Sequence, residues 1–222
     1  MDRAHFRTRI KFCGLTRPGD VRLACELGVD AVGLVFAERS RRRISIEQAA
    51  LLRHAVPPMV SVVALFMDAP VARVAKVIEA AKPDLLQFHG NEPDAWCRQF
   101  GLPYLKAVPM GDRAEAGDAP ADEARLFGPY PGAAGFLLDS HAAGEAGGSG
   151  RSFDWSRIPT GLSRPMLLAG GLSPETVGAA IAQAAPWGVD VSSGIEASPG
   201  LKDGERMRAF VRAVREADTR AG

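Results

Sequence analysis

Cysteine, net charge and long apolar runs are all scarce in this sequence of 222 residues. Its three cysteines lack C-x-x-C spacing, which argues against a disulfide framework or a structural zinc site. The net charge of +1 gives no electrostatic case for binding nucleic acid or an anionic membrane. No apolar run approaches the roughly 20 residues of a membrane span, and residues 1–9 lack the apolar core of a signal peptide. We therefore expect a cytoplasmic protein with no membrane or nucleic-acid partner.

Apolar segments of strand length recur along the chain and alternate with helical patterns. Hydrophobic residues make up 46% of the sequence, which is enough for a sizeable core, and the length suits one large domain. Predicted strands cover residues 10–13, 31–36, 60–66, 85–88, 104–108, 136–139, 166–169 and 189–192. Predicted helices cover residues 19–27, 45–54, 70–81, 93–100, 121–126, 174–185 and 203–217.

This repeat of strand and helix indicates parallel strands joined by crossover connections. Eight such strands fit a closed (β/α)8 barrel, an α/β fold that needs about 200 residues or more. An open doubly wound sheet is the alternative, but no G-x-G-x-x-G motif follows the first strand. We predict a single (β/α)8 TIM-barrel domain over residues 1–222.

Two helix starts carry capping signals. Ser45 stands three residues before Gln48, which fits a capping box. Pro174 follows Ser173, so we expect this proline in the first turn of a helix.

A glycine-rich segment, residues 142–152, follows the sixth predicted strand. Glycine gives the backbone wide conformational freedom, and a mobile loop at the catalytic face of a barrel can close over a ligand. A plain flexible connection explains the composition equally well. The sequence leaves both interpretations open.

Active sites of such barrels lie at the carboxyl ends of the strands, so polar residues at those positions are the candidates for chemistry. Cys13 ends the first predicted strand, although a cysteine taken alone is more often a small buried hydrophobe. The other candidates, in chain order, are Arg39, Arg41, Arg42, Arg43, Gln87, His89, Asp139, Gly170, Gly171, Ser192, Ser193 and Gly194.

Glycine turns follow the seventh and eighth predicted strands, where barrels often bind phosphate. Bare backbone N–H groups and the start of a short helix at residues 193–196 would favour a phosphate dianion. Two tight turns without a ligand are the alternative interpretation. We predict a phosphate site that includes Gly170, Gly171, Ser192, Gly194 and Ile195.

Lys11 lies on the same strand face as Cys13, one step further into the barrel. An ammonium group inside a barrel must be paired. Asp190 stands at the matching level of the eighth strand, which closes beside the first. We predict a Lys11–Asp190 ion pair below the active site, and the alternative is that Lys11 reaches solvent.

The predicted strand ends offer only His89 and Asp139 as convincing metal ligands. That is too few for a metal-dependent sugar epimerase, so we expect no metal site. His89 could contact a substrate or be a hydrogen-bonded structural histidine.

Seven motifs, in order and at compatible spacing from about Arg9 to Val214, resemble those of the phosphoribosylanthranilate isomerase family. They are Lys11-Phe12-Cys13-Gly14-Leu15-Thr16, Ser40-Arg41-Arg42-Arg43-Ile44-Ser45, Gln87-Phe88-His89-Gly90, Leu137-Leu138-Asp139-Ser140, Gly148-Ser149-Gly150 with Phe153-Asp154-Trp155, Ala169-Gly170-Gly171-Leu172 and Asp190-Val191-Ser192-Ser193-Gly194-Ile195-Glu196. The resemblance implies a (β/α)8 barrel that uses neither metal nor organic cofactor. It further implies an Amadori rearrangement in tryptophan biosynthesis, with N-(5-phosphoribosyl)anthranilate as substrate and 1-(2-carboxyphenylamino)-1-deoxyribulose 5-phosphate as product.

By the same resemblance, Cys13 would be the general base and Asp139 the general acid. Arg42 would hold the anthranilate carboxylate, although any arginine of the run from Arg39 to Arg43 could do so through a bidentate fork. The chemistry agrees, because opening the furanose needs a carboxylic acid that keeps its proton, and removing the C2 proton needs a base. A nearby cation would lower the pKa of the thiol.

Two other functions remain open from the sequence. One is another phosphosugar isomerase or epimerase barrel, and the other is a non-catalytic phosphosugar-binding protein. The sequence does not decide between a monomer and a homodimer.

Overall fold

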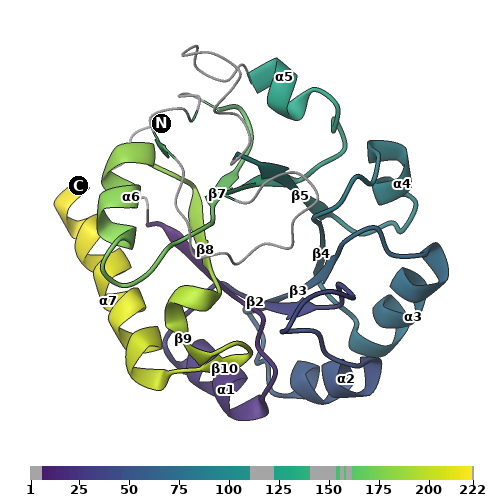
Figure 1. Cartoon of the computed structure of the whole chain (residues 1–222), viewed down its shortest axis with the longest axis horizontal. Coiled ribbons are helices and arrows are strands. Elements are labelled where there is room, and N and C mark those ends of the chain that lie inside the picture. Colours follow the sequence, from purple (N-terminus) through teal and green to yellow (C-terminus); the bar gives the residue numbers. More distant parts are fainter. Residues whose placement is uncertain (1–6, 111–122, 141–153, 156–157, 159–161, 222) are drawn as a thin grey trace.

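The computed structural model describes residues 7–110, 123–140, 154–155, 158 and 162–221. Eight parallel strands form a closed barrel in which each strand pairs with the next and β8 pairs back to β1 (Figure 1). The strands are β1 (Arg9–Cys13), β2 (Ala31–Val35), β3 (Ser61–Phe66), β4 (Leu85–Phe88), β5 (Tyr104–Pro109), β6 (Gly135–Asp139), β7 (Met166–Leu168) and β8 (Gly188–Val191).

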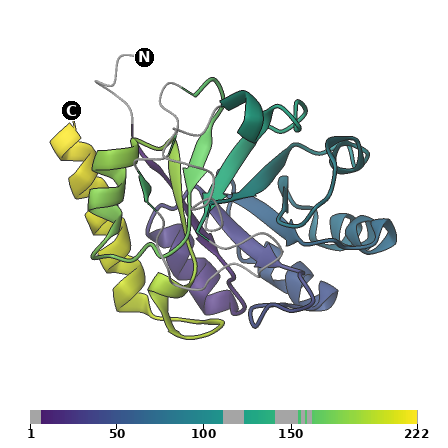
Figure 2. The same cartoon turned by 45° about the horizontal axis from the view of Figure 1, so that its top comes forward.

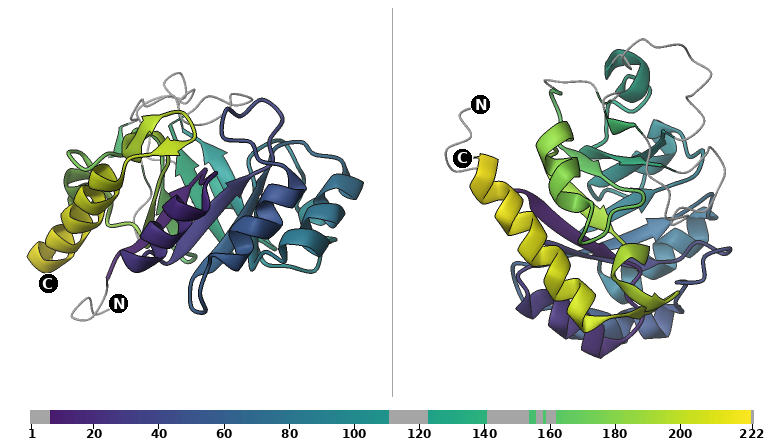
Figure 3. Two further views of the ribbon diagram at one scale, coloured as in Figure 1. Left: turned by 90° about the horizontal axis from the view of Figure 1, so that it is seen from below. Right: turned by 60° about the vertical axis from the view of Figure 1, so that its left-hand side comes forward.

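Helices surround this barrel on its outside (Figures 1 and 2). They are α1 (Pro18–Glu26), α2 (Ile46–His54), α3 (Val71–Ala81), α4 (Asp94–Arg98), α5 (Glu123–Phe127), α6 (Val177–Ala184) and α7 (Gly204–Ala221). The side view in Figure 3 shows α7, the longest of them, running across the outside of the barrel beside α6. Within the described ranges, none of these helices combines the length and the apolar character that a membrane-spanning helix requires.

Side-chain alternation along the strands separates the core from the site. Ile10 and Phe12 of β1 are buried toward the helices, where the Phe12 ring meets Phe210 of α7 edge-on with 5.9 Å between ring centroids. Lys11 and Cys13 point the other way, into the barrel. Burial of each large apolar side chain contributes about 1.5–3 kcal/mol, so the layer between strands and helices holds the strand ends in place.

An additional small element follows β8. The chain forms a short 3-10 helix, η3 (Ser193–Ile195), and then an antiparallel hairpin of β9 (Glu196–Ser198) and β10 (Leu201–Lys202). Gly200 makes the turn with a φ of +83°, a backbone conformation that glycine adopts without strain. The register of this β9–β10 hairpin places Lys202 directly opposite Glu196.

The predicted barrel is confirmed, and all eight strands begin and end within one residue of their predicted bounds. The capping box is confirmed as well, since Ser45 Oγ accepts from the Gln48 N–H while Gln48 Oε1 accepts from the Ser45 N–H. That residues 1–222 form one domain stays a prediction. The glycine-rich residues 142–152 lie outside the described residues.

The predicted start of the helix at Pro174 is wrong. The helix begins at Val177, because Ser173 first forms a turn in which its N–H donates to Thr176 Oγ1 at 2.9 Å. The predicted helix over residues 93–100 is also shorter than expected and ends at Arg98.

Candidate active site

A cavity opens at the carboxyl ends of the strands, where β1, β2, β3, β4, β6, β8 and the loop after β2 meet. We call it the mouth cavity. Its lining comprises Cys13, Val35, Ala37, Ser40, Arg42, Leu65, Met67, Gln87, His89, Asp139, Asp190 and Ser192. A wider groove of about 670 Å³ lies between the starts of α2 and α3, but it contains neither Cys13 nor Asp139. The mouth cavity is therefore the candidate active site.

Cys13 ends β1 beside a buried ion pair. Lys11 Nζ lies 2.7 Å from Asp190 Oδ1, which confirms the predicted pair and excludes a lysine that reaches solvent. The β1–β8 register brings the two residues level. Burial alone would lower the pKa of Lys11, but Asp190 and Cys13 together raise it above its ordinary value.

Burial favours the neutral, protonated form of the Cys13 thiol. Burial raises the pKa of the Cys13 thiol and outweighs Lys11 and Lys202, which both act to lower it. The expected cation is therefore present and acts in the expected direction, but burial has the larger effect and the pKa of the thiol is raised overall. Gly33 of β2 leaves room for the sulfur, since a Cβ at that position would lie 2.8 Å from Cys13 Sγ.

Asp139 ends β6 across the mouth cavity and contacts His89. Its Oδ2 lies 3.4 Å from His89 Nε2, and the side chains of His89 and Asp139 are 9% and 8% exposed. His89 Nδ1 lies 3.3 Å from Gln87 Nε2, so the end of β4 orients the imidazole ring toward the carboxyl group. The structure thus brings together the predicted acid Asp139 and the predicted ligand contact His89.

Arg42 is the arginine of the run that lines the mouth cavity. Its side chain is 12% exposed, whereas Arg43 is 41% exposed and pairs with Glu38 outside the cavity. Arg39 and Arg41 are exposed. The backbone of Gly14, with a φ of +72°, lies against Arg42, and a Cβ there would come within 2.5 Å of Arg42 Cδ.

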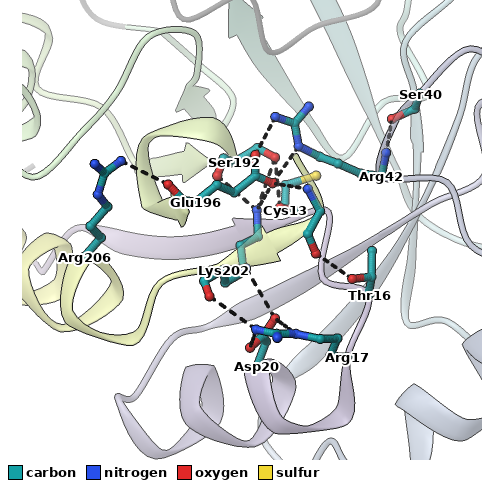
Figure 4. Close-up of polar contacts among 11 residues, drawn as sticks. Cys13, Thr16, Arg17, Asp20, Ser40, Arg42, Ser192, Glu196, Lys202 and Arg206 are labelled. Atoms are coloured by element: carbon teal, nitrogen blue, oxygen red, sulfur yellow. Dashed lines mark hydrogen bonds and ion pairs between the residues drawn. The ribbon is translucent and has the colours of Figure 1, made fainter. Parts of the chain in front are cut away.

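Glu196 of the β9–β10 hairpin holds Arg42 in place, and Lys202 of the same hairpin holds Glu196 (Figure 4). Glu196 accepts from Arg42 Nε at 2.7 Å and from the terminal NH2 nitrogen at 2.8 Å. Lys202 Nζ donates to the same carboxylate at 2.9 Å and to the Ser192 carbonyl at 3.0 Å. Ser192 Oγ in turn donates to the Cys13 carbonyl at 3.0 Å. These contacts join the ends of β1 and β8 to the loop after β2.

The sequence-based interpretation missed the roles of Glu196 and Lys202. Glu196 was expected only as the end of a short helix, and Lys202 had no role. The Pro199-Gly200 dipeptide between them is a turn signal that could have predicted the hairpin and, with it, the pairing of the two residues.

Glycines shape the loops after β7 and β8. Gly170 and Gly171 have φ values of +82° and +65°, and a Cβ at Gly170 would collide with Ser140. A Cβ at Gly194 would collide with the carbonyl of Leu172, so η3 packs directly on the loop after β7. The two predicted phosphate loops are therefore neighbours. In the described part of the chain, no group of three or more His, Cys, Asp or Glu side chains could hold a metal ion.

Comparisons with known proteins point to one family. Residues 10–213 match the family described as PRAI, N-(5′phosphoribosyl)anthranilate (PRA) isomerase. A relative from Xanthomonas campestris pv. campestris (strain 8004), named N-(5′-phosphoribosyl)anthranilate isomerase, is 58% identical over 219 residues and 98% of either chain. The crystal structure of phosphoribosyl anthranilate isomerase from Thermus thermophilus is similar, with a TM-score of 0.81 and 35% identity, covering 94% of this chain and 99% of that one. A phosphoribosyl anthranilate isomerase in complex with reduced 1-(o-carboxyphenylamino)-1-deoxyribulose 5-phosphate has a TM-score of 0.75 and 32% identity over 94% of this chain and 99% of that one. The chain belongs to the N-(5′-phosphoribosyl)anthranilate isomerase family.

Proposed function

We infer that this protein catalyses the reaction of its family, the Amadori rearrangement of N-(5′-phosphoribosyl)anthranilate to 1-(2-carboxyphenylamino)-1-deoxyribulose 5-phosphate in tryptophan biosynthesis. The match over residues 10–213 supports this function. The single observation that carries it in the structure is the mouth cavity, which holds the Cys13 thiol and the Asp139 carboxyl group on different strands of the barrel. One sugar ring between them would meet an acid and a base together.

Asp139 acts first, as general acid. Its proton goes to the furanose ring oxygen, the bond from that oxygen to C1 breaks, and the anthranilate nitrogen supplies the electron pair that makes the C1=N iminium. Cys13 then takes the proton from C2, whose bonding electrons form C1=C2 while the C=N electrons return to nitrogen. Proton transfer from the C2 hydroxyl oxygen to C1 completes the ketone. Positioned acids and bases of this kind typically contribute about 10²–10⁴-fold each.

Cys13 must be a thiolate to accept the C2 proton. Burial holds the pKa of its thiol above the ordinary value, so the thiolate is a minor species at neutral pH. The Lys11 ammonium is the cation that stabilises it, because it lies on the same face of β1 and is fixed by Asp190.

The aryl end of the substrate fits the wall of the mouth cavity nearest Arg42. That wall combines apolar side chains with a single guanidinium, which suits an aromatic ring that carries a carboxylate. Its apolar members are Val35, Ala37, Leu65 and Met67.

The 5′-phosphate would lie against the loops after β7 and β8. Gly170, Gly171, Gly194 and Ile195 would present backbone N–H groups, and Ser192 would add a hydroxyl group. The adjacent packing of these loops supports one shared site. The reduced product bound in a structure of the same family contains such a phosphate, which also supports a small phosphoribosyl ligand here.

Replacing the acid or the base tests this function. We expect Cys13→Ser and Asp139→Asn each to lower kcat by roughly 100-fold or more, with small effects on binding of the reduced product, because each removes one proton-transfer group and little volume. Turnover is followed by the fluorescence decay of the anthranilate derivative. Unchanged turnover in Asp139→Asn would remove this residue from the acid role.

Two readouts separate the alternative functions. A non-catalytic binding protein would show no fluorescence decay in a single-turnover experiment with excess protein. A metal-dependent epimerase would lose activity after chelation, whereas we expect turnover here to be unchanged. A cytoplasmic location and the choice between monomer and homodimer stay predictions.

A further inference from the structure

Among the residues that the structure describes, the contacts of Arg42 leave one edge of its guanidinium group available. A guanidinium carries five N–H donors in a plane, and Glu196 takes the edge formed by Nε and one terminal nitrogen. Figure 4 shows Glu196 along that edge, with the other terminal nitrogen turned away from it. The remaining edge, formed by the two terminal nitrogens, can accept a second carboxylate end-on.

Glu196 itself has little freedom to move. Its side chain is 4% exposed, and its Oε1 accepts from Lys202 Nζ at 2.9 Å and from the Gly200 N–H at 3.2 Å in addition to Arg42. The Lys202 side chain is fully buried and also bonded to Ser192. Arg206 donates to the Glu196 carbonyl at 3.0 Å. These contacts fix the Glu196 carboxylate, which can therefore hold the Arg42 guanidinium group in one orientation.

The charges of Arg42 and its partners also favour an anionic ligand at this edge. Arg42 and Lys202 are cationic and Glu196 is anionic, so the three paired side chains carry a net charge of +1, and of the three Arg42 lines the mouth cavity. Buried charges are expected to be balanced. An anionic carboxylate placed on the open edge of Arg42 would supply that balance.

We propose that Glu196 is a positioning residue that orients Arg42, so that the open edge of its guanidinium group receives the carboxylate of an aryl ligand. The proposal rests on the proposed function, in which Arg42 binds the anthranilate carboxylate. Glu196 makes no contact with the substrate in this scheme. It acts by fixing the guanidinium plane before the ligand arrives.

The experiment compares two ligands that differ in one group. The reduced product carries the aryl carboxylate, and its phenylamino counterpart lacks it. The test ratio is the dissociation constant of the phenylamino counterpart divided by that of the reduced product, both measured by calorimetry. It reports the carboxylate contact alone. We expect Glu196→Gln to lower this ratio by about 10-fold, because the neutral amide can no longer hold both nitrogens as a charged pair. For the reaction, KM should rise more than kcat falls.

Two further variants separate a specific effect on the ratio from a general loss of stability. Glu196→Asp keeps the charge but is one methylene shorter, so it cannot reach both nitrogens and should also lower the ratio. Glu92→Gln breaks another buried carboxylate–lysine pair, with Lys106 at 3.2 Å, outside the lining of the mouth cavity. This matched control should lose stability and keep the ratio. An equal change of the ratio in Glu92→Gln would overturn the proposal.

The variant Arg42→Ala separates this proposal from the proposed function. If Arg42→Ala lowers the ratio while both Glu196 variants retain it, positioning by Glu196 is wrong and the arginine contact stands. If Arg42→Ala also retains the ratio, the carboxylate contact itself is wrong. When both proposals hold, adding Glu196→Gln to Arg42→Ala causes no further loss.

Discussion

At the scale of single residues, the environment of Cys13 determines what the thiol can do. Burial raises its pKa, and the Lys11 ammonium beside it works against burial. Asp190 is needed to keep that ammonium inside the barrel, because an unpaired buried cation is costly. The pair therefore contributes to the reactivity of the sulfur although neither member has to touch the reacting carbon.

The pH dependence of kcat/KM tests this arrangement. Activity should rise with pH on the alkaline side, because the base is a thiolate whose pKa lies above the ordinary value of about 8.5. The double variant Lys11→Met/Asp190→Asn removes the pair without leaving a lone charge. We expect the alkaline limb of its kcat/KM profile, the part that rises with pH, to move to higher pH. Lys106→Met/Glu92→Gln is the matched control and should leave the limb in place. A limb that is equally displaced in both would argue against a role for Lys11.

Gly14 offers a second test at this scale. Gly14→Ala places a Cβ against Arg42, whereas Gly28→Ala, at a similar φ of +77°, meets open space. Both substitutions should destabilise the protein by about 1–2 kcal/mol through backbone strain. Only Gly14→Ala should raise KM, by roughly 10-fold, because it displaces the guanidinium group. Steady-state kinetics and thermal unfolding of the two variants decide the matter.

At the scale of elements, the sequence predicted the repeating strands and helices and the short helix η3, and missed the β9–β10 hairpin. The apolar strands of β1 to β8 are evident because each is a buried run followed by a turn. The β9–β10 hairpin has strands of three and two residues, too short for any periodicity to show. The family resemblance indicated Arg42, but the contact that holds its side chain was not predicted, because Glu196 comes from that hairpin.

The capping box at the start of α2 gives a prediction at this scale. Ser45→Ala should lower the free energy of unfolding by about 1 kcal/mol, because the Gln48 N–H loses its acceptor. The cap lies outside the mouth cavity, so KM should be unchanged. Urea denaturation measures the first effect, and a KM that rises together with the stability loss would show that α2 supports the site more directly.

At the scale of the whole molecule, closure of the barrel was predictable and the contact that ties its last helix was not. Eight strand segments at regular spacing fit only a few folds, and the β1–β8 pairing follows from closure. The contact between Thr8 and Asp218 joins residues at the two ends of the described chain. Thr8 donates through its N–H at 3.0 Å and through its hydroxyl group at 2.6 Å to Asp218 Oδ1. No local pattern encodes such a contact, because it depends on where α7 packs.

Asp218→Ala tests how much this contact stabilises the barrel. We expect a loss of about 1–3 kcal/mol in the free energy of unfolding, because a backbone N–H and a buried hydroxyl group lose their acceptor. Glu216→Ala, an exposed position on the same helix, is the control and should cost little. Equal losses in the two variants would show that the Thr8 contact adds no stability.

The seclusion of the Cys13 sulfur also bears on inhibitor design. Small alkylating reagents react with accessible thiolates, and the partly buried Cys25 on α1 is easier to reach than the buried Cys13 sulfur. Covalent inhibitors that rely on electrophile strength alone would therefore label the wrong cysteine. Selectivity for Cys13 over Cys25 has to come from the part of the inhibitor that binds the site. An aryl carboxylate that Arg42 recognises could place a weakly reactive electrophile beside Cys13.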